Sequence, residues 1–194
     1  MLIRFVLVLL NFLLVLDFVL IQMILVLLNL LVLMVKIGIC DFLIDNIKAI
    51  RAMGFPWEME IADMGFLNNA LRLAQEGVFD PKGTDFWLDY CLGFGAMPAT
   101  ARHLVFAQDE GQRLFPNAKW AVLATGRDQF PMSILGASMG CDIVRIGFED
   151  NIYLPDGRPA RQNHELITAM AHIARDLGRE VASVNDAREI FGVG

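Results

Sequence analysis

After residue 36, apolar positions along the chain change repeatedly between helical spacing and short continuous runs. Leu166, Met170 and Ile173 recur three or four residues apart and predict the best-defined helix of the chain. Short apolar runs bounded by glycine, such as residues 119–124, are typical of buried strands. By these patterns we expect helices at residues 41–53, 68–75, 98–108, 131–139, 163–177 and from about 183, and strands at 55–62, 86–93, 119–124 and 141–146.

The order of these elements is a helix, four strand–helix units and a closing helix. Such alternation predicts an α/β fold with a parallel sheet under helices, either an open doubly wound sheet or a barrel. No GxGxxG or P-loop motif follows a strand, which disfavours the nucleotide-binding doubly wound folds. A (β/α)8 TIM barrel has eight such units. Four units therefore favour half of a barrel, and we assign residues 37–194 to this partial TIM-barrel domain.

The first 36 residues follow a different pattern. Residues 5–35 are almost entirely Leu, Val, Ile, Phe and Met. The 18 residues from Phe18 to Val35 carry no charge, which approaches the roughly 20 that a bilayer-spanning helix needs. Their Val, Ile and Phe content also allows a strand-rich segment. We expect residues 1–36 to form a separate apolar, low-complexity segment, either a membrane helix or a non-native N-terminus without an evolved role.

Composition and charge narrow the range of partners. The chain has 194 residues and a net charge of −6, and the acidic excess lies after residue 40. This balance excludes a nucleic-acid partner, which would need a clustered basic face. Cys40, Cys91 and Cys141 are far apart and lack CxxC spacing, which argues against disulfides and an all-cysteine zinc site. We expect a cytoplasmic protein, with membrane association through residues 5–35 as the alternative.

Candidate functional residues lie at the ends of the predicted strands, where both α/β architectures collect their functional groups. These residues are Glu60, Gly126, Arg127, Arg145, Glu149 and Asp150. A carboxylate pair beside an arginine suits a metal ligand next to a general base, with the guanidinium binding an anion or an enolate oxygen. A solvated loop with local salt bridges is the alternative for the last three. Glu60 is either an acid–base group or a carboxylate that lines a barrel.

The run Arg-Ile-Gly-Phe-Glu-Asp-Asn-Ile-Tyr-Leu at residues 145–154 resembles the signature of the β-keto acid cleavage enzymes. The founding type of that family is the 3-keto-5-aminohexanoate cleavage enzyme of lysine fermentation. Further segments agree with the family in order and spacing, among them Gly-Ala-Met-Pro-Ala-Thr at 95–100 and Ala-Thr-Gly-Arg-Asp-Gln-Phe-Pro-Met at 124–132. The resemblance covers residues 41–194 and implies the C-terminal half of a (β/α)8 barrel.

This resemblance implies a zinc-dependent retro-Claisen reaction, in which a β-keto acid and acetyl-CoA give acetoacetate and a new acyl-CoA. It implies that Glu149 is the metal-ligand carboxylate, that Asp150 is the base or its orienter, and that Arg145 binds the anion. Glu60 is implied to assist proton transfer. The metal would polarise the keto oxygen, so that enolate charge develops beside the cation and the arginine. The pocket for substrate or coenzyme A is implied to include Gly126 and Arg127.

The chain departs from the family pattern at the metal site. The family takes a His-x-His pair from an early strand, whereas the histidines here are His103, His164 and His172, all in predicted helices. One carboxylate does not hold zinc, which takes three or four protein ligands. In addition, Phe66 stands where the family usually has histidine. We therefore expect the chain to bind zinc poorly, to turn over little keto acid alone and to expose sheet edges that favour assembly. Family resemblance also implies a homo-oligomer.

Two other functions are compatible with the sequence. One is a membrane-anchored, non-catalytic binding or scaffold module that uses residues 1–36 as its anchor. The other is a different α/β-barrel lyase or aldolase without zinc, which would need a lysine at a strand end to form a Schiff base. Lys119 begins its predicted strand rather than ending it, which disfavours the aldolase.

Overall fold

The computed structural model describes residues 41–54 and 56–191. The apolar segment expected at residues 1–36 lies outside the described residues. The chain divides into two compact units between residues 47 and 48. The described part of the first unit is helical, and the second unit begins with helical residues 48–52 and contains all the strands. Within the described ranges, no helix combines the length and the apolar content that crossing a bilayer requires.

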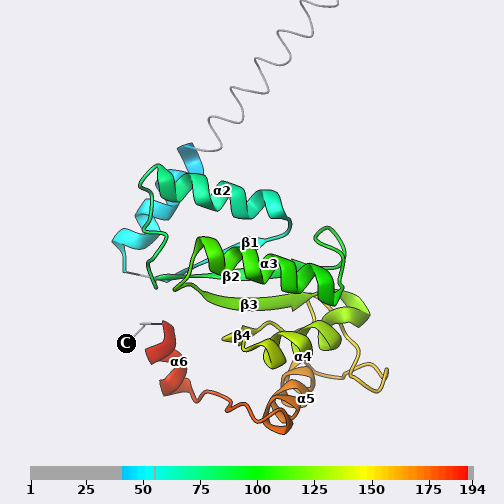
Figure 1. Cartoon of the computed structure of the whole chain (residues 1–194). Helices are drawn as coiled ribbons and strands as arrows, with labels where there is room; N and C mark the ends of the chain where they lie inside the picture. Colours follow the sequence, from blue (N-terminus) through cyan, green and yellow to red (C-terminus); the bar gives the residue numbers. More distant parts are fainter. Residues whose placement is uncertain (1–40, 55, 192–194) are drawn as a thin grey trace, which may run out of the picture. The chain divides into compact units, whose positions relative to one another are not determined.

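The second unit contains a four-stranded sheet in which every neighbouring pair of strands is parallel. The strands lie side by side in chain order, and the first and last form the edges (Figure 1). They are β1 (Trp57–Ile61), β2 (Phe86–Leu92), β3 (Lys119–Ala124) and β4 (Ile143–Val144). The pairing of β4 continues beyond its two residues, because the backbone N–H of Arg145 donates to the Val122 carbonyl oxygen. The predicted parallel sheet is thereby confirmed.

Helices connect the strands and form a layer on one face of the sheet. They are α2 (Met64–Gln75), α3 (Ala101–Leu114) and α4 (Gln129–Met139), with a short 3-10 turn η1 (Gly126–Asp128) before α4. Two more helices, α5 (Asn163–Asp176) and α6 (Val184–Phe191), follow β4, the last described strand. Each of α2, α3 and α4 contacts the strand before it, and α3 lies between the other two (Figure 1). A doubly wound sheet carries helices on both faces. Strands in sequential order with crossovers of one hand place them on one face, which is consistent with consecutive units of a barrel.

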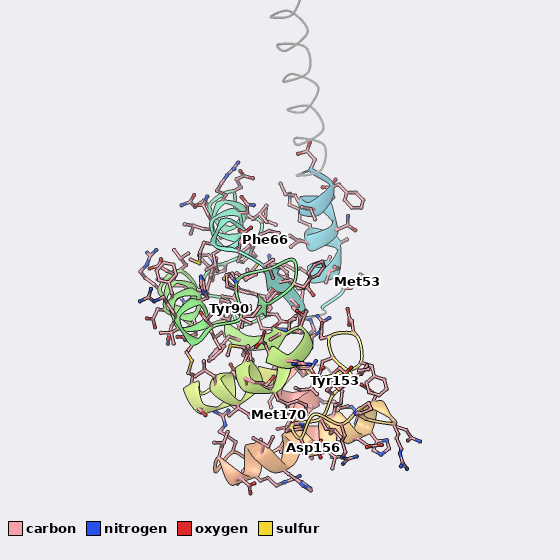
Figure 2. All side chains as sticks on the ribbon, turned by 90° about the vertical axis from the view of Figure 1, so that its right-hand side faces the viewer. Met53, Phe66, Tyr90, Tyr153, Asp156 and Met170 are labelled. Carbon is pink, nitrogen blue, oxygen red and sulfur yellow. The ribbon has the colours of Figure 1, made fainter. Side chains whose placement is uncertain are left out.

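The hydrophobic core lies between the sheet and this helix layer. Phe86, Leu88 and Tyr90 of β2 are each at most 2% exposed, and Tyr90 lies beside α3 (Figure 2). A Cβ at Gly111 of α3 would collide with the Tyr90 hydroxyl, so the missing side chain lets the helix approach the strand. Four aromatic rings pack with centroids 5.0 to 6.0 Å apart; they are Trp57, Phe79, Phe86 and Phe115.

Side chains alternate along a strand, so Trp87, Asp89 and Cys91 of β2 face away from the helix layer. The register places Asp89 opposite Glu60 of β1. The Trp87 ring contacts that of Phe191 in α6, with centroids 5.0 Å apart. α6 thus touches this second face near the beginning of β2, whereas the charged side chains gather toward the strand ends.

Most predicted elements are confirmed, but several predicted boundaries are wrong. α2 begins at Met64 rather than at residue 68, because the Asp63 carboxylate accepts hydrogen bonds from the N–H groups of Gly65 and Phe66 and caps the helix. α4 begins before Pro131, which a first helical turn tolerates because the N–H that proline lacks has no partner there. α3 begins at residue 101 and runs on to residue 114, and β4 is shorter than the predicted 141–146.

Candidate functional site

Arg145 is surrounded by carboxylates at the C-terminal end of the sheet. Its guanidinium nitrogens lie 2.8 Å from a Glu149 oxygen, 2.9 Å from Glu60 and 3.5 Å from Asp150. A fourth carboxylate, that of Asp89, lies 3.9 Å away. The residues that the sequence singled out at the ends of the first and fourth strands are therefore brought into contact with one another.

Strand register explains how residues 85 positions apart come together. Asp89 pairs with Glu60 on one side and with Ala121 of β3 on the other, and Ala121 pairs with Ile143 of β4. Arg145 follows Ile143 by two residues, so its side chain leaves the sheet on the same face. From there the guanidinium extends to β1, where Nη1 donates to Glu60.

The loop after β4 is held in place by hydrogen bonds to its backbone. The N–H groups of Asp150 and Asn151 donate to the Gly147 carbonyl oxygen, which forms a tight turn. The Asn163 side chain, at the start of α5, accepts from the Phe148 N–H at 2.9 Å. The Gly126 N–H donates to the Asp150 carbonyl oxygen at 2.7 Å. These bonds fix the loop between two helix starts and bring Gly126 next to Asp150.

Arg127, the other predicted pocket residue, lies beside a separate cavity. This cavity of about 620 Å³ is formed by η1, the start of α4 and the long loop after β4, on which Tyr153 lies (Figure 2). Its lining residues include Arg127, Phe130, Ile134, Asn151, Tyr153 and Leu154. Gly126 thus adjoins the backbone of Asp150, whereas Arg127 lines a mostly apolar cavity that includes Asn151, the residue after Asp150.

Asp89 is a site residue that we did not identify from the sequence. It is 0% exposed, and neither of its carboxylate oxygens has a hydrogen-bond partner among the described residues. Burial, followed by the negative charge of Glu58, raises its pKa to about 7. A single aspartate inside the apolar strand Phe-Trp-Leu-Asp-Tyr-Cys-Leu was the available signal. Ligand atoms of Asp89, Glu60 and Cys91 all lie within 4.8 Å of one another.

Burial and the neighbouring charges shift the pKa values of other groups in the site. Burial raises the pKa of the Asp150 carboxyl, and the nearby Arg145 opposes that shift without cancelling it. Burial and then the charge of Asp89 raise the pKa of the Cys91 thiol to about 12. Burial alone would lower the pKa of Arg145, but its carboxylate partners raise it above the usual range. Arg145 is therefore a permanent cation, and Asp150 is a stronger base than an exposed aspartate.

The zinc site implied by family resemblance does not fit the described residues. Glu149 is largely exposed, pairs with Arg145 and belongs to no described group of three or more neighbouring His, Cys, Asp or Glu side chains. The three histidines do not neighbour Glu149 in the sequence, and all of them lie on helices. His103 in α3 hydrogen-bonds to Thr100 at 2.8 Å, and the other two, His164 and His172, are exposed on α5.

Comparison with known proteins matches residues 33–193 to the beta-keto acid cleavage enzyme family. The chain is 37% identical over 146 residues to the 3-keto-5-aminohexanoate cleavage enzyme of Fusobacterium nucleatum, which covers 75% of this chain and 51% of that protein. It is 34% identical over 154 residues to the protein of the same name from Acetoanaerobium sticklandii, covering 79% and 54%. A third relative is the 3-oxoadipate:acetyl-CoA acetyltransferase of Cupriavidus necator, 30% identical over 153 residues, covering 78% and 52%.

The chain spans about half the length of the curated relatives it matches. The matched residues include every described strand and the whole Arg145 site. The resemblance inferred from residues 145–154 is therefore confirmed. On these grounds the chain belongs to the beta-keto acid cleavage enzyme family.

Proposed function

We propose that this chain provides the arginine–carboxylate part of an enzyme that exchanges acyl groups between a β-keto acid and acetyl-CoA, giving acetoacetate and a new acyl-CoA. The observation that carries the proposal is the contact of Arg145 with Glu60, Glu149 and Asp150 at the C-terminal ends of parallel strands, where barrel enzymes hold their active sites. Acetyl-CoA as co-substrate is supported by the names of two relatives, the acetyltransferase above and a 3,5-dioxohexanoate:acetyl-CoA acetone transferase.

Each residue has a role that follows from its surroundings. Arg145 binds the substrate carboxylate or the enolate oxygen, because it is a permanent cation and its partner Glu149 is exposed enough to be displaced. Asp150 removes the proton from the substrate carbon, since its raised pKa makes it a better base near neutral pH. Glu60 hydrogen-bonds to Arg145 and is 57% exposed, which suits it to pass the proton on.

The reaction balances without an oxidant or a reductant. Asp150 takes a proton from the carbon between the keto and carboxyl groups, and the resulting enolate carbon attacks the acetyl-CoA carbonyl. The CoA thiolate leaves and then attacks the original keto carbonyl, which breaks the bond between that carbonyl and the central carbon. The carbanion released is the enolate of acetoacetate, and it recovers the proton. Arg145 stabilises negative charge on oxygen in both enolates.

The position of Gly126 and Arg127 supports a role in binding rather than in proton transfer. Gly126 holds the backbone of Asp150, and Arg127 borders the mostly apolar cavity that Asn151 also lines. We assign this cavity to part of the substrate or of coenzyme A. Zinc, which the family resemblance implies, would polarise the keto oxygen, but Glu149 alone does not fit that ion, and no step above depends on it.

The proposal also concerns the fold of the domain that contains the four strands. We infer that the four strands are half of a (β/α)8 barrel, a view supported by the sequential strand order and the one-sided helix layer. A complete barrel pairs every strand on both sides, so the edges β1 and β4 would join further strands. The predictions of a homo-oligomer, of a cytoplasmic location and of a domain at residues 37–194 belong to this proposal as well.

Incubation of the purified full chain with acetyl-CoA and a panel of β-keto acids tests the proposed reaction. We expect acetoacetate and one new acyl-CoA to form in equal amounts, slowly, and only when both substrates are present; mass spectrometry measures both products. Formation of acetate and free CoA instead would indicate thioester hydrolysis and contradict the proposal, as would the absence of acetoacetate with every keto acid. The structure disfavours the aldolase alternative as far as Lys119 is concerned, because Lys119 is the first residue of β3 and not the last.

A further inference from the structure

Glu60, Asp89 and Cys91 form a group of potential metal ligands on the open face of the sheet. Glu60 and Asp89 are paired residues of β1 and β2, and Cys91 follows Asp89 by two residues, so all three side chains leave the sheet on the same side. One ligand atom from each lies within 4.8 Å of the other two. Ligand atoms around a tetrahedral zinc ion are about 3.5 Å apart, given metal–oxygen and metal–sulfur distances of about 2.1 and 2.3 Å. Small side-chain rotations would therefore suffice to enclose an ion.

The burial of Asp89 is an independent indication that this group binds a ligand. Its side chain is 1% exposed, and both oxygens lack a hydrogen-bond partner among the described residues. In the described part of the chain, the cation paired with Asp89 is Arg145, whose Nη1 is 3.9 Å away and already donates to Glu60 at 2.9 Å. A buried carboxylate without a partner is costly unless it is protonated or bound to a cation.

Charge at the site favours a bound cation. Arg145 faces Glu60, Asp89, Glu149 and Asp150, so a single positive charge stands against four carboxylates. A divalent ion would reduce this imbalance. The Arg145 hydrogen bond uses only one of the two Glu60 oxygens, Oε1, and the Glu60 side chain is more than half exposed. An ion can therefore enter from solvent and retain a water molecule on the Glu60 side.

We infer that Glu60, Asp89 and Cys91 bind a divalent transition-metal ion of the zinc type through two carboxylates and one thiolate. The thiolate selects against magnesium and calcium, which take oxygen ligands, and favours zinc or cobalt. Three protein ligands with one open position are typical of a catalytic rather than a structural zinc site. The ligand set differs from the Glu149 site implied by family resemblance. It shares Glu60 with the proposed acyl exchange, but its test measures metal binding and not turnover, so either proposal can fail without the other.

Cobalt(II) titration of the full chain tests this site, because a cysteine ligand produces a thiolate-to-cobalt charge-transfer band in the near ultraviolet. All proteins carry Cys40→Ala, so that Cys91 and Cys141 are the cysteines present. We expect one cobalt per chain with this band, and displacement of cobalt by zinc. Cys91→Ala should abolish the band, and Asp89→Asn should weaken cobalt binding by about a hundredfold or more, or about 2.7 kcal/mol.

Cys141→Ala is the matched control, because Cys141 is also buried but lies next to Arg179 and outside the ligand group. This variant should keep the band at unchanged affinity. Circular dichroism checks that each variant is folded, and Asp89→Asn, which replaces a carboxylate by a neutral group of the same size, provides a second route if Cys91→Ala does not fold. A band that persists in Cys91→Ala, a band lost in folded Cys141→Ala, or no cobalt binding by the starting protein would overturn the inference.

Discussion

At the residue scale, Arg145 determines the electrostatics of the site. It is the only cation in contact with Glu60, Asp89 and Asp150 within the part of the chain that the structure describes, and it bridges Glu60 to the loop after β4. Its planar guanidinium contacts carboxylates through separate nitrogens, which the single ammonium of lysine cannot do. Substitution at this position should therefore alter substrate binding even when the charge is kept.

Arg145→Lys should lower kcat/KM for the keto acid by at least about tenfold, equivalent to about 1.4 kcal/mol of lost transition-state stabilisation. Lysine keeps the charge but places it on one nitrogen, so it cannot reproduce the separate contacts of Nη1 with Glu60 and of Nη2 with Glu149. Steady-state production of acetoacetate by the purified variant measures the effect. The matched control is Arg113→Lys, because Arg113 also pairs with a glutamate, Glu110, but on the exposed surface of α3. Equal activity of the two variants would contradict the role assigned to Arg145.

The raised pKa of Asp89 predicts that the free energy of unfolding of the metal-free chain depends on pH. A chelator keeps the chain free of metal during the measurement. The Asp89 pKa of about 7 lies above that of an unfolded aspartate, so the folded state binds the proton more tightly. The free energy of unfolding should therefore fall as the pH rises from about 4 to about 7, by on the order of 4 kcal/mol, and level off above that range. Urea unfolding at several pH values measures this slope.

Asp89→Asn should remove that part of the slope, because asparagine does not titrate. The variant should be more stable than the parent at pH 8 and of similar stability below about pH 4, where Asp89 is protonated in both the folded and the unfolded parent. A difference in the free energy of unfolding between variant and parent that stays constant with pH would show that Asp89 does not titrate with a raised pKa.

At the element scale, local contacts of strands and helices place the site. β2 is held under α3 by the close approach of Gly111 to Tyr90, and this approach fixes which face of β2 Asp89 occupies. The loop after β4 is fixed at both ends, by Asn163 of α5 and by Gly126 of η1. The position of the carboxylates therefore depends on packing on the opposite face of the sheet.

Gly111→Ala should destabilise the fold by about 1–3 kcal/mol, because the added methyl group collides with the buried Tyr90 hydroxyl. The effect opposes the higher helix propensity of alanine, about 1 kcal/mol. Combining the substitution with Tyr90→Phe removes the hydroxyl, and the loss due to alanine should then become smaller. A double-mutant cycle by chemical denaturation measures the coupling; additive effects would show that the two residues do not interact.

At the scale of the whole molecule, the sequence predicted the α/β order and the parallel sheet because strand and helix periodicities alternate clearly after residue 40. It also predicted that Glu60 and Arg145 belong to strand ends, since the change from apolar to charged residues is abrupt there. It did not predict Asp89, because its partners come from neighbouring strands whose register is a tertiary property. Helix starts were missed where side-chain capping, as at Asp63, extended the helix beyond its apolar pattern.

The central claim, acyl exchange at the Arg145 site, is tested most directly with acetyl-CoA that carries ¹³C in the acetyl carbonyl. After incubation of the full chain with an unlabelled β-keto acid, NMR locates the label. The proposed sequence of bond changes predicts that the label appears at the keto carbon of acetoacetate, while the new acyl-CoA is unlabelled. Label in acetate, label in the new acyl-CoA or label that stays wholly in acetyl-CoA would contradict the account.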